Sequence, residues 1–562
     1  MEPIINPFEH EPAIDPELVP HPDALARRIA ADIDAWESDL SGLKRRWDRN
    51  AEVYRVNPDY VTMQAVEGME PYAVPLSRIK CDNVVGNVRT ALFASEPYVN
   101  VESGGDANLD AQRERAITKL AKEARLERMA EGALWCAYQY NLGILRIAAI
   151  SDNGIKGVEG EWLDPRHVCI YPSDESDPWR SRTFGHRFYE PMWTVERRME
   201  EGIYASERLF GTGDRRQHEP NAASNPMGEA TTARRADDSP ELWEVETWER
   251  TPKGWKRLLC TLARNPAKLL RVREYGYDVS RYSIWKFLNT EKGLLCEDSL
   301  AQALQGVNIA ASDLFTAYVQ VALGRATPMV FVIGGSLGPD RVQNFSWGTI
   351  YDGLDEGTQI VPVSPGGDVS GLAGSLEKIE QYADGVAGMS QIGANQQLPA
   401  STSATAVNAL MQSDSRGQDR LLQAATEGAE QAFRILDAIW RADYEGFVRR
   451  YGRSVRVDDP HKLSSPADIT SSARTVGSPQ VLMQKLQALW EMSSDPASAL
   501  DRPKVAQRII QALNLPFEPE DVAGQLQTGV SMEALAALGG GLPAAPAGPA
   551  APDASAPGQP VG

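Results

Sequence analysis

Residues 298–333 read DSLAQALQGVNIAASDLFTAYVQVALGRATPMVFVI, and this stretch decides the fold. Its apolar residues recur at alternating steps of four and three, which is the spacing of a helix that packs along another helix. They are Leu300, Leu304, Val307, Ala311, Leu314, Tyr318 and Val321. The pattern predicts a helix over residues 299–324, which at about 1.5 Å per residue would be roughly 39 Å long.

The residues after this helix predict a small β-rich insert and then a second helix. Gly324 and Pro328 end the first helix, and the apolar run Met329–Ile333 is typical of a buried strand. The chain turns at a glycine pair and returns in extended form as far as Val363. A helical period resumes over residues 375–392, with an apolar stripe of Leu376, Ile379, Ala383, Val386 and Met389. Two helices therefore flank a short β-rich insert.

The residues before this stretch predict an α+β unit. A long helix is expected over residues 110–141, where apolar residues follow a helical period. Hairpin turns are indicated at Asp152–Gly154 and Pro252–Gly254. The first strand of the second hairpin alternates large apolar residues with Glu244 and Glu246, as expected of a strand with two different faces.

The order of elements resembles one known family. A strand at Tyr282–Leu288 precedes the first helix, a polar loop at residues 393–403 follows the second, and a helical pattern then runs over residues 404–450. This order resembles that of the portal (head–tail connector) proteins of tailed bacteriophages, which is strand, long helix, small insert, second helix, polar loop and very long helix. The resemblance lies in this order and covers most of the chain.

The resemblance implies an α+β portal-like fold with a mixed α/β wing, a two-helix stem, a β-rich clip, a long helix, an α-helical crown and a disordered C-terminal tail. The implied boundaries are 1–22 for an N-terminal extension, 23–298 for the wing with a disordered loop at 206–240, 299–324 for stem helix 1, 325–374 for the clip, 375–392 for stem helix 2, 393–403 for the tunnel loop, 404–450 for the long helix, 451–530 for the crown and 531–562 for the tail.

The resemblance also implies a function and partners. Portal proteins form rings, typically homododecamers, at the unique vertex of the capsid in the virion. The ring is the channel for DNA packaging and ejection, and it nucleates procapsid assembly in the host cytoplasm. The implied partners are further copies of the chain, double-stranded DNA, the terminase large subunit, the major capsid and scaffolding proteins, and the head–tail adaptor.

Three sets of contact residues follow from the resemblance. The tunnel loop would face DNA with polar side chains, and its candidates are Gln391, Asn395, Gln396, Gln397, Ser401 and Thr402. The clip would contact the motor or adaptor through Arg341, Asn344, Trp347 and Tyr351. The stem seam, which would pack between helices, comprises Leu300, Leu304, Val307, Leu314, Tyr318 and Val321.

Charge and hydropathy exclude some classes of protein. The net charge is −20, whereas a protein that grips DNA normally presents a basic patch. An acidic wall would let DNA slide through a channel without sticking, but the same charge would also keep an abundant protein soluble, and both interpretations remain open. We expect no membrane span, because no run of about 18 apolar residues occurs, and no signal peptide, because residues 1–22 are acidic and rich in proline.

We expect no enzyme activity, metal or cofactor. The five cysteines include no C-x-x-C pair and are expected to be buried thiols, and the sequence contains no G-x-x-x-x-G-K-[ST] motif for ATP. Gly334–Gly338 fits the G-x-S-x-G motif of hydrolases around Ser336, but Pro339 follows where that motif must open a helix. The alternatives are another structural virion oligomer, such as a scaffold or tail component without a DNA channel, and a serine hydrolase that uses Ser336.

Overall fold

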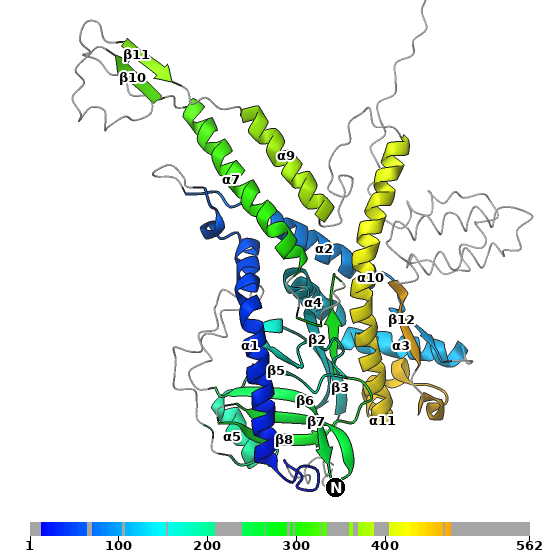
Figure 1. Ribbon diagram of the computed structural model, residues 1–562. Helices are drawn as coiled ribbons and strands as arrows, with labels where there is room; N and C mark the ends of the chain where they lie inside the picture. Colours follow the sequence, from blue (N-terminus) through cyan, green and yellow to red (C-terminus); the bar gives the residue numbers. More distant parts are fainter. Residues whose placement is uncertain are drawn as a thin grey trace, which may run out of the picture. The chain divides into compact units, whose positions relative to one another are not determined.

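The computed structural model of the chain mixes helices and strands, which confirms the predicted α+β class (Figure 1). It describes residues 13–63, 70–103, 107–152, 155–207, 209, 239–264, 266–288, 293–295, 298–326, 329–333, 359–363, 369–386, 404–464 and 467–473. All of these residues belong to one structural unit. The predicted tunnel loop, most of the predicted crown, the loop at 206–240 except for a few residues, and the predicted tail lie outside the described residues.

Helices and strands are interspersed along the described residues. The α-helices are α1 (Pro22–Tyr54), α2 (Leu76–Leu92), α3 (Ala107–Glu123), α4 (Leu126–Tyr140), α5 (Met192–Glu200), α7 (Leu300–Ala326), α9 (Val369–Val386), α10 (Ala404–Ala442) and α11 (Tyr444–Tyr451). The strands are β1 (Val99–Glu102), β2 (Gly143–Asp152), β3 (Ile155–Leu163), β4 (Val168–Tyr171), β5 (Thr183–Tyr189), β6 (Glu241–Thr251), β7 (Gly254–Ala263), β8 (Lys268–Glu274), β9 (Tyr282–Trp285), β10 (Met329–Ile333), β11 (Gln359–Val363) and β12 (Asp468–Ser471).

The strands pair antiparallel throughout the described part of the chain. One sheet has the order β4-β5-β6-β7-β8 and another the order β3-β2-β9, while β1 pairs with β12 and β10 with β11. Asp152 pairs with Ile155 and Thr251 with Gly254, so the strands on either side of each predicted turn pair with one another. Both predicted hairpins are therefore confirmed.

The five-stranded sheet is covered by α1 on one face. This helix contacts β4 and β8, the two outer strands, so it crosses the whole sheet. Ile29 and Trp36 of α1 lie in the same hydrophobic core as Val245 of β6. Leu242 points to the other face, because it is an odd number of residues from Val245, and there it packs with Val195 of α5.

Residues 110–141, predicted as one helix, form α3 and α4. The helix breaks at Arg125, which adopts a left-handed conformation with φ of 52°. The predicted end at Asn141 is correct: this residue also has a positive φ, and its Oδ1 accepts hydrogen bonds from the backbone amides of Phe287 and Leu288. Asn is among the few residues that adopt this conformation readily, whereas Arg is not, which is why only the second stop was visible in the sequence.

Two other predicted helices have different bounds. α9 begins at Val369 instead of Ser375, because packing against α7 outweighs the low helix propensity of Gly371 and Gly374. The helix predicted over 404–450 is divided after Ala442 into α10 and α11, and α11 packs against β3. The predicted strand Met329–Ile333 is confirmed as β10.

Candidate assembly site

The helix α7 is the centre of the candidate site. It contacts α9, which lies beside it in Figure 1, and it also contacts α1, α2 and α4. The hairpin β10–β11 lies between the two helices in the chain, since β10 begins at Met329 and α9 follows β11. Two neighbouring helices thus enclose a pair of antiparallel strands in sequence, as predicted from the residues that follow the first helix.

The stem seam divides into two halves. Leu300 is 5% exposed and Leu304 is fully buried, so the first half of the seam packs within a single chain. Val307 is half-buried and packs against the same core. Substituting Leu304 therefore tests the folding of the chain and not contacts between copies.

The second half of the seam is only partly covered. Leu314, Tyr318 and Val321 are half-buried, and between residues 314 and 323 no apolar side chain of α7 is buried. The apolar residues of this half extend around most of the helix, namely Leu314, Phe315, Ala317, Tyr318, Val319, Val321 and Leu323, and the remaining side is polar, with Asp313, Thr316 and Gln320. Leu323 is exposed and the other apolar side chains are only half-buried, so part of this apolar surface is left uncovered by the chain.

A row of polar residues on α7 holds the segment that leads into α2. Asn308, Ser312 and Thr316, which we call the polar ladder, recur every four residues and are buried. The backbone amides of Ser77, Val74 and Tyr72 donate to them in that order, over 2.9, 3.0 and 3.1 Å. The hydroxyls of Ser312 and Thr316 donate in turn to carbonyls one turn back in α7, which leaves their lone pairs for these amides.

The polar ladder was missed in the sequence because Ser and Thr also occur on solvent-exposed helix faces. The available signal was polar residues at a spacing of four in a helix that is otherwise apolar. Asp313, one residue further round the helix, accepts hydrogen bonds from the backbone amides of Thr62 and Met63 over 2.9 and 2.8 Å. The backbone of residues 62–63 and 72–77 is therefore fixed to α7 at five amides, counting these two and the three of the ladder.

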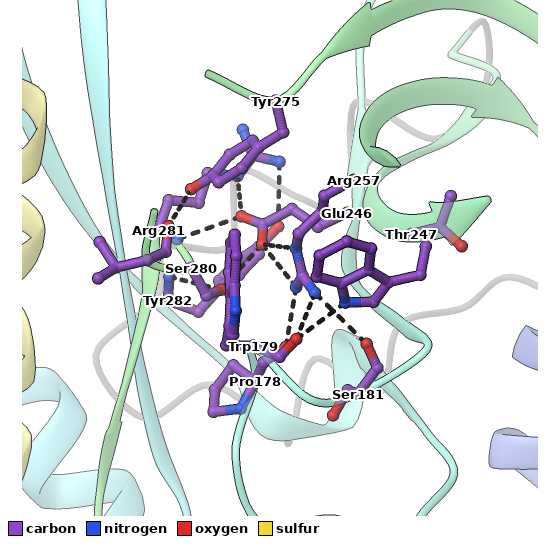
Figure 2. A network of polar contacts seen from close by, with 12 residues as sticks. Pro178, Trp179, Ser181, Glu246, Thr247, Arg257, Tyr275, Ser280, Arg281 and Tyr282 are labelled. Carbon is purple, nitrogen blue, oxygen red and sulfur yellow. Dashed lines mark hydrogen bonds and ion pairs between the residues drawn. The ribbon is translucent and has the colours of Figure 1, made fainter. Parts of the chain in front are cut away.

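The sheets β4-β5-β6-β7-β8 and β3-β2-β9, together with helices α1 to α5, are called the α/β body below. A second polar cluster lies inside this body (Figure 2). Glu246 of β6 is fully buried, and its Oε2 accepts hydrogen bonds from Nη2 of Arg257 over 2.8 Å and from Oγ of Ser280 over 2.9 Å. Nε of Arg281 lies 3.2 Å from Oε1. The Arg257 guanidinium also lies 4.8 Å from the ring centre of Trp179. One carboxylate thus holds two buried guanidinium groups.

The neighbouring groups extend this buried network. Burial alone would raise the pKa of Glu244, but the charges of Arg281 and Arg146 outweigh it and lower the pKa to about 2. Burial lowers the pKa of His186 to about 3, so this histidine is neutral near pH 7. Its Nδ1 lies 2.9 Å from the Tyr282 hydroxyl. A network of this kind stabilises the fold, because each charged group lies beside a group of opposite charge inside the protein.

The network explains why large apolar residues alternate with Glu244 and Glu246 along β6. Glu244 and Glu246 lie on the strand face opposite Val245, as the sequence predicts, but that face is covered by the segment around Trp179 and by Arg281. Glu246 is therefore a buried charge and Glu244 a half-buried one, and the two do not form a solvated surface. Only a contact from a distant part of the chain distinguishes the two cases.

Most of the other predicted site residues lie outside the described residues. These are the tunnel-loop candidates Gln391, Asn395, Gln396, Gln397, Ser401 and Thr402, the clip candidates Arg341, Asn344, Trp347 and Tyr351, and Ser336. Four of the five cysteines are described and all four are buried, as predicted. Within the described ranges no group of three or more His, Cys, Asp or Glu side chains could hold a metal ion.

Comparisons with known proteins leave the chain without a family. No protein-family model matches it, and no curated protein matches it. In the part of the chain that the structure describes, no helix has the length and apolar character needed to cross a membrane.

Proposed function

We propose that the chain is a portal protein: a subunit of a ring at one vertex of a phage capsid, through which DNA is packaged and ejected. The observation that carries the proposal is the helix pair α7 and α9, which encloses the hairpin β10–β11 in sequence and has an incompletely covered apolar surface. In the proposal this pair is the stem and the hairpin belongs to the clip. The long helix α10 follows, in the order that the family resemblance implies.

The uncovered half of α7 supports assembly into a closed oligomer. Apolar surface buried between copies contributes roughly 25 cal/mol per Å², before the cost of association. In a ring each subunit presents two different surfaces, one to each neighbour, so a helix that is apolar around most of its circumference suits a position between two copies. Tyr318 and Val321 are the seam residues that we assign to this contact.

The charge and motifs of the chain are compatible with a passive channel. A net charge of −20 disfavours tight binding of DNA phosphates, and the polar tunnel-loop candidates would meet DNA without holding it. The sequence has no phosphate-binding loop for ATP, so a separate terminase would supply the energy for packaging. Further proposed partners are the capsid, scaffolding and adaptor proteins.

Negative-stain electron microscopy of the purified full-length chain tests the proposal. We expect rings with an axial hole, at a mass of about twelve times the 61.5 kDa of one chain. Oligomers without an axial hole would favour a scaffold or tail component instead. Particles that remain single chains at micromolar concentration would contradict the ring.

A further inference from the structure

The two helices of the pair are held in different ways. α7 is anchored to the body by buried apolar residues such as Leu304 and by the polar ladder. In α9, only Ala383 and Asp384 are buried among residues 370–386. Tyr382, next to them, is 64% exposed. Apart from its contact with α7, α9 is therefore fixed to the body by its last two turns.

The buried contact of α9 is an ion pair. The ammonium group of Lys80 in α2 donates to Oδ1 of Asp384, and the two side chains are 4% and 2% exposed. Oδ2 of Asp384 is buried and has no hydrogen-bond partner. Lys80 is thus the group that compensates the negative charge of this carboxylate in the part of the chain that the structure describes.

The position of Asp384 in α9 makes its carboxylate depend more strongly on the charge of Lys80. The residue lies near the C-terminal end of α9, which ends at Val386, and the backbone carbonyls there carry partial negative charge. A carboxylate at this end of a helix is disfavoured by the helix dipole. Without Lys80, docking of α9 would bury an unpaired charge in an unfavourable field, and undocking would return it to water.

The other end of the contact is rigid. α2 follows the segment held by the polar ladder, and the amide of Ser77 in its first turn donates to Asn308 of α7. α2 also contacts α4 and α10. The site that receives Asp384 therefore stays in place whether or not α9 is docked.

We propose that Lys80 and Asp384 form a latch that positions α9, and that α9 detaches from α2 when one charge of the pair is removed while the sheets stay folded. The pair then defines two states of one helix, docked on α2 and detached from it, which differ in the burial of Ala383 and Asp384. Lys80 and Asp384 act as positioning residues, because they set the place of α9 and contact no ligand.

Hydrogen exchange of the full-length chain, followed by mass spectrometry, tests the latch. In Lys80→Met, peptides from residues 369–386 should exchange at least tenfold faster than in the wild type, because the docked state would hold an unpaired carboxylate. Peptides from β6 and β7 should exchange at the wild-type rate. Asp384→Asn, which keeps the shape of the side chain, should show the same pattern to a smaller degree.

Two further variants separate the latch from ordinary destabilisation. Lys80→Met combined with Asp384→Leu replaces the pair by apolar side chains and should restore slow exchange in α9. Arg78→Gln is the matched control, since Arg78 lies on α2 two residues away and is paired with Asp82 at an exposed site. In this variant, peptides from residues 369–386 should exchange at the wild-type rate.

The proposal is overturned if α9 exchanges at the wild-type rate in Lys80→Met, if α9 and the sheets lose protection together, or if the double variant exchanges as fast as Lys80→Met. The measurement follows one helix within a chain. A failure of the latch is therefore distinguishable from a failure to form rings.

Discussion

The α/β body and the α7–α9 pair differ in how far one chain supplies the contacts that their side chains need. The body buries charges, such as Glu246 with Arg257 and Arg281, and surrounds each with partners from its own chain. The second half of α7 has apolar side chains, such as Tyr318 and Val321, that its own chain covers only in part. The buried charges of the body have their partners within one chain, whereas the helix pair has apolar side chains that the chain leaves partly exposed. Changes in the two regions should therefore have different consequences.

The largest effect is expected in the buried network of the body. Glu246→Ala would leave Arg257 and Arg281 buried without their shared carboxylate, and should lower the free energy of unfolding by about 3–5 kcal/mol. Urea denaturation of the variant and the wild type measures this difference. Glu445→Ala is the control, because Glu445 pairs with Arg449 on the surface at 83% exposure. An effect of Glu246→Ala as small as that of the control would show that the network is not a stabilising unit.

The next largest effect on stability is expected in the stem seam, where it compares the buried first half with the half-buried second half. Leu304→Ala removes a fully buried side chain and should cost about 2–5 kcal/mol of unfolding free energy. Val321→Ala should cost much less in a dissociated chain, because Val321 is only half-buried there. Thermal denaturation at low and high protein concentration distinguishes the two. Equal losses in both variants would show that the two halves of the seam have the same role.

Acid should weaken the body through His186. Burial lowers its pKa to about 3 in the folded chain, against an ordinary value of 6.5, so the unfolded chain binds more protons as the pH falls below 6.5. The stabilisation is complete above pH 6.5 and is lost as the pH falls towards 3. Between pH 6.5 and 4.5 the loss from His186 should be about 2 kcal/mol.

His186→Gln tests this window, because glutamine keeps a polar side chain but does not titrate. The variant should show a flatter dependence of unfolding free energy on pH between 6.5 and 4.5, measured by urea denaturation at several pH values. The exposed His461→Gln controls for the loss of a histidine. A slope equal to that of the wild type would contradict a buried neutral His186.

The smallest effect concerns the polar ladder. Ser312→Ala removes the acceptor of the Val74 amide and should cost about 1–2 kcal/mol, with faster hydrogen exchange in residues 70–77. Ser375→Ala is the matched control, since the Ser375 hydroxyl donates to the carbonyl of Gly371 within α9 at an exposed site. Unchanged exchange in residues 70–77 would mean that the ladder does not hold this segment.

Local sequence patterns predicted the helices and strands. Which side chains are buried or paired depends on long-range contacts, which these patterns do not show. The spacing of the seam predicted α7, and the turns predicted both hairpins, because these signals lie within a few residues. The break at Arg125 left no signal in the sequence, and the burial of Glu246 depends on Arg281, which directly precedes β9. The Lys80–Asp384 pair joins residues 304 positions apart, so neither residue alone indicates a contact. Of the candidate site, the described seam residues could be placed from spacing, but which of them are covered within one chain could not.

The most direct test of the account is the mass of Val321→Asp beside the wild type, measured in solution by mass photometry. A charge at Val321 should block contacts between copies but leave the body folded, so the variant should be a 61.5 kDa monomer with the circular dichroism spectrum of the wild type. The wild type should be a ring-sized oligomer. If the variant assembles to the same mass as the wild type, the second half of α7 is not the surface that joins the copies.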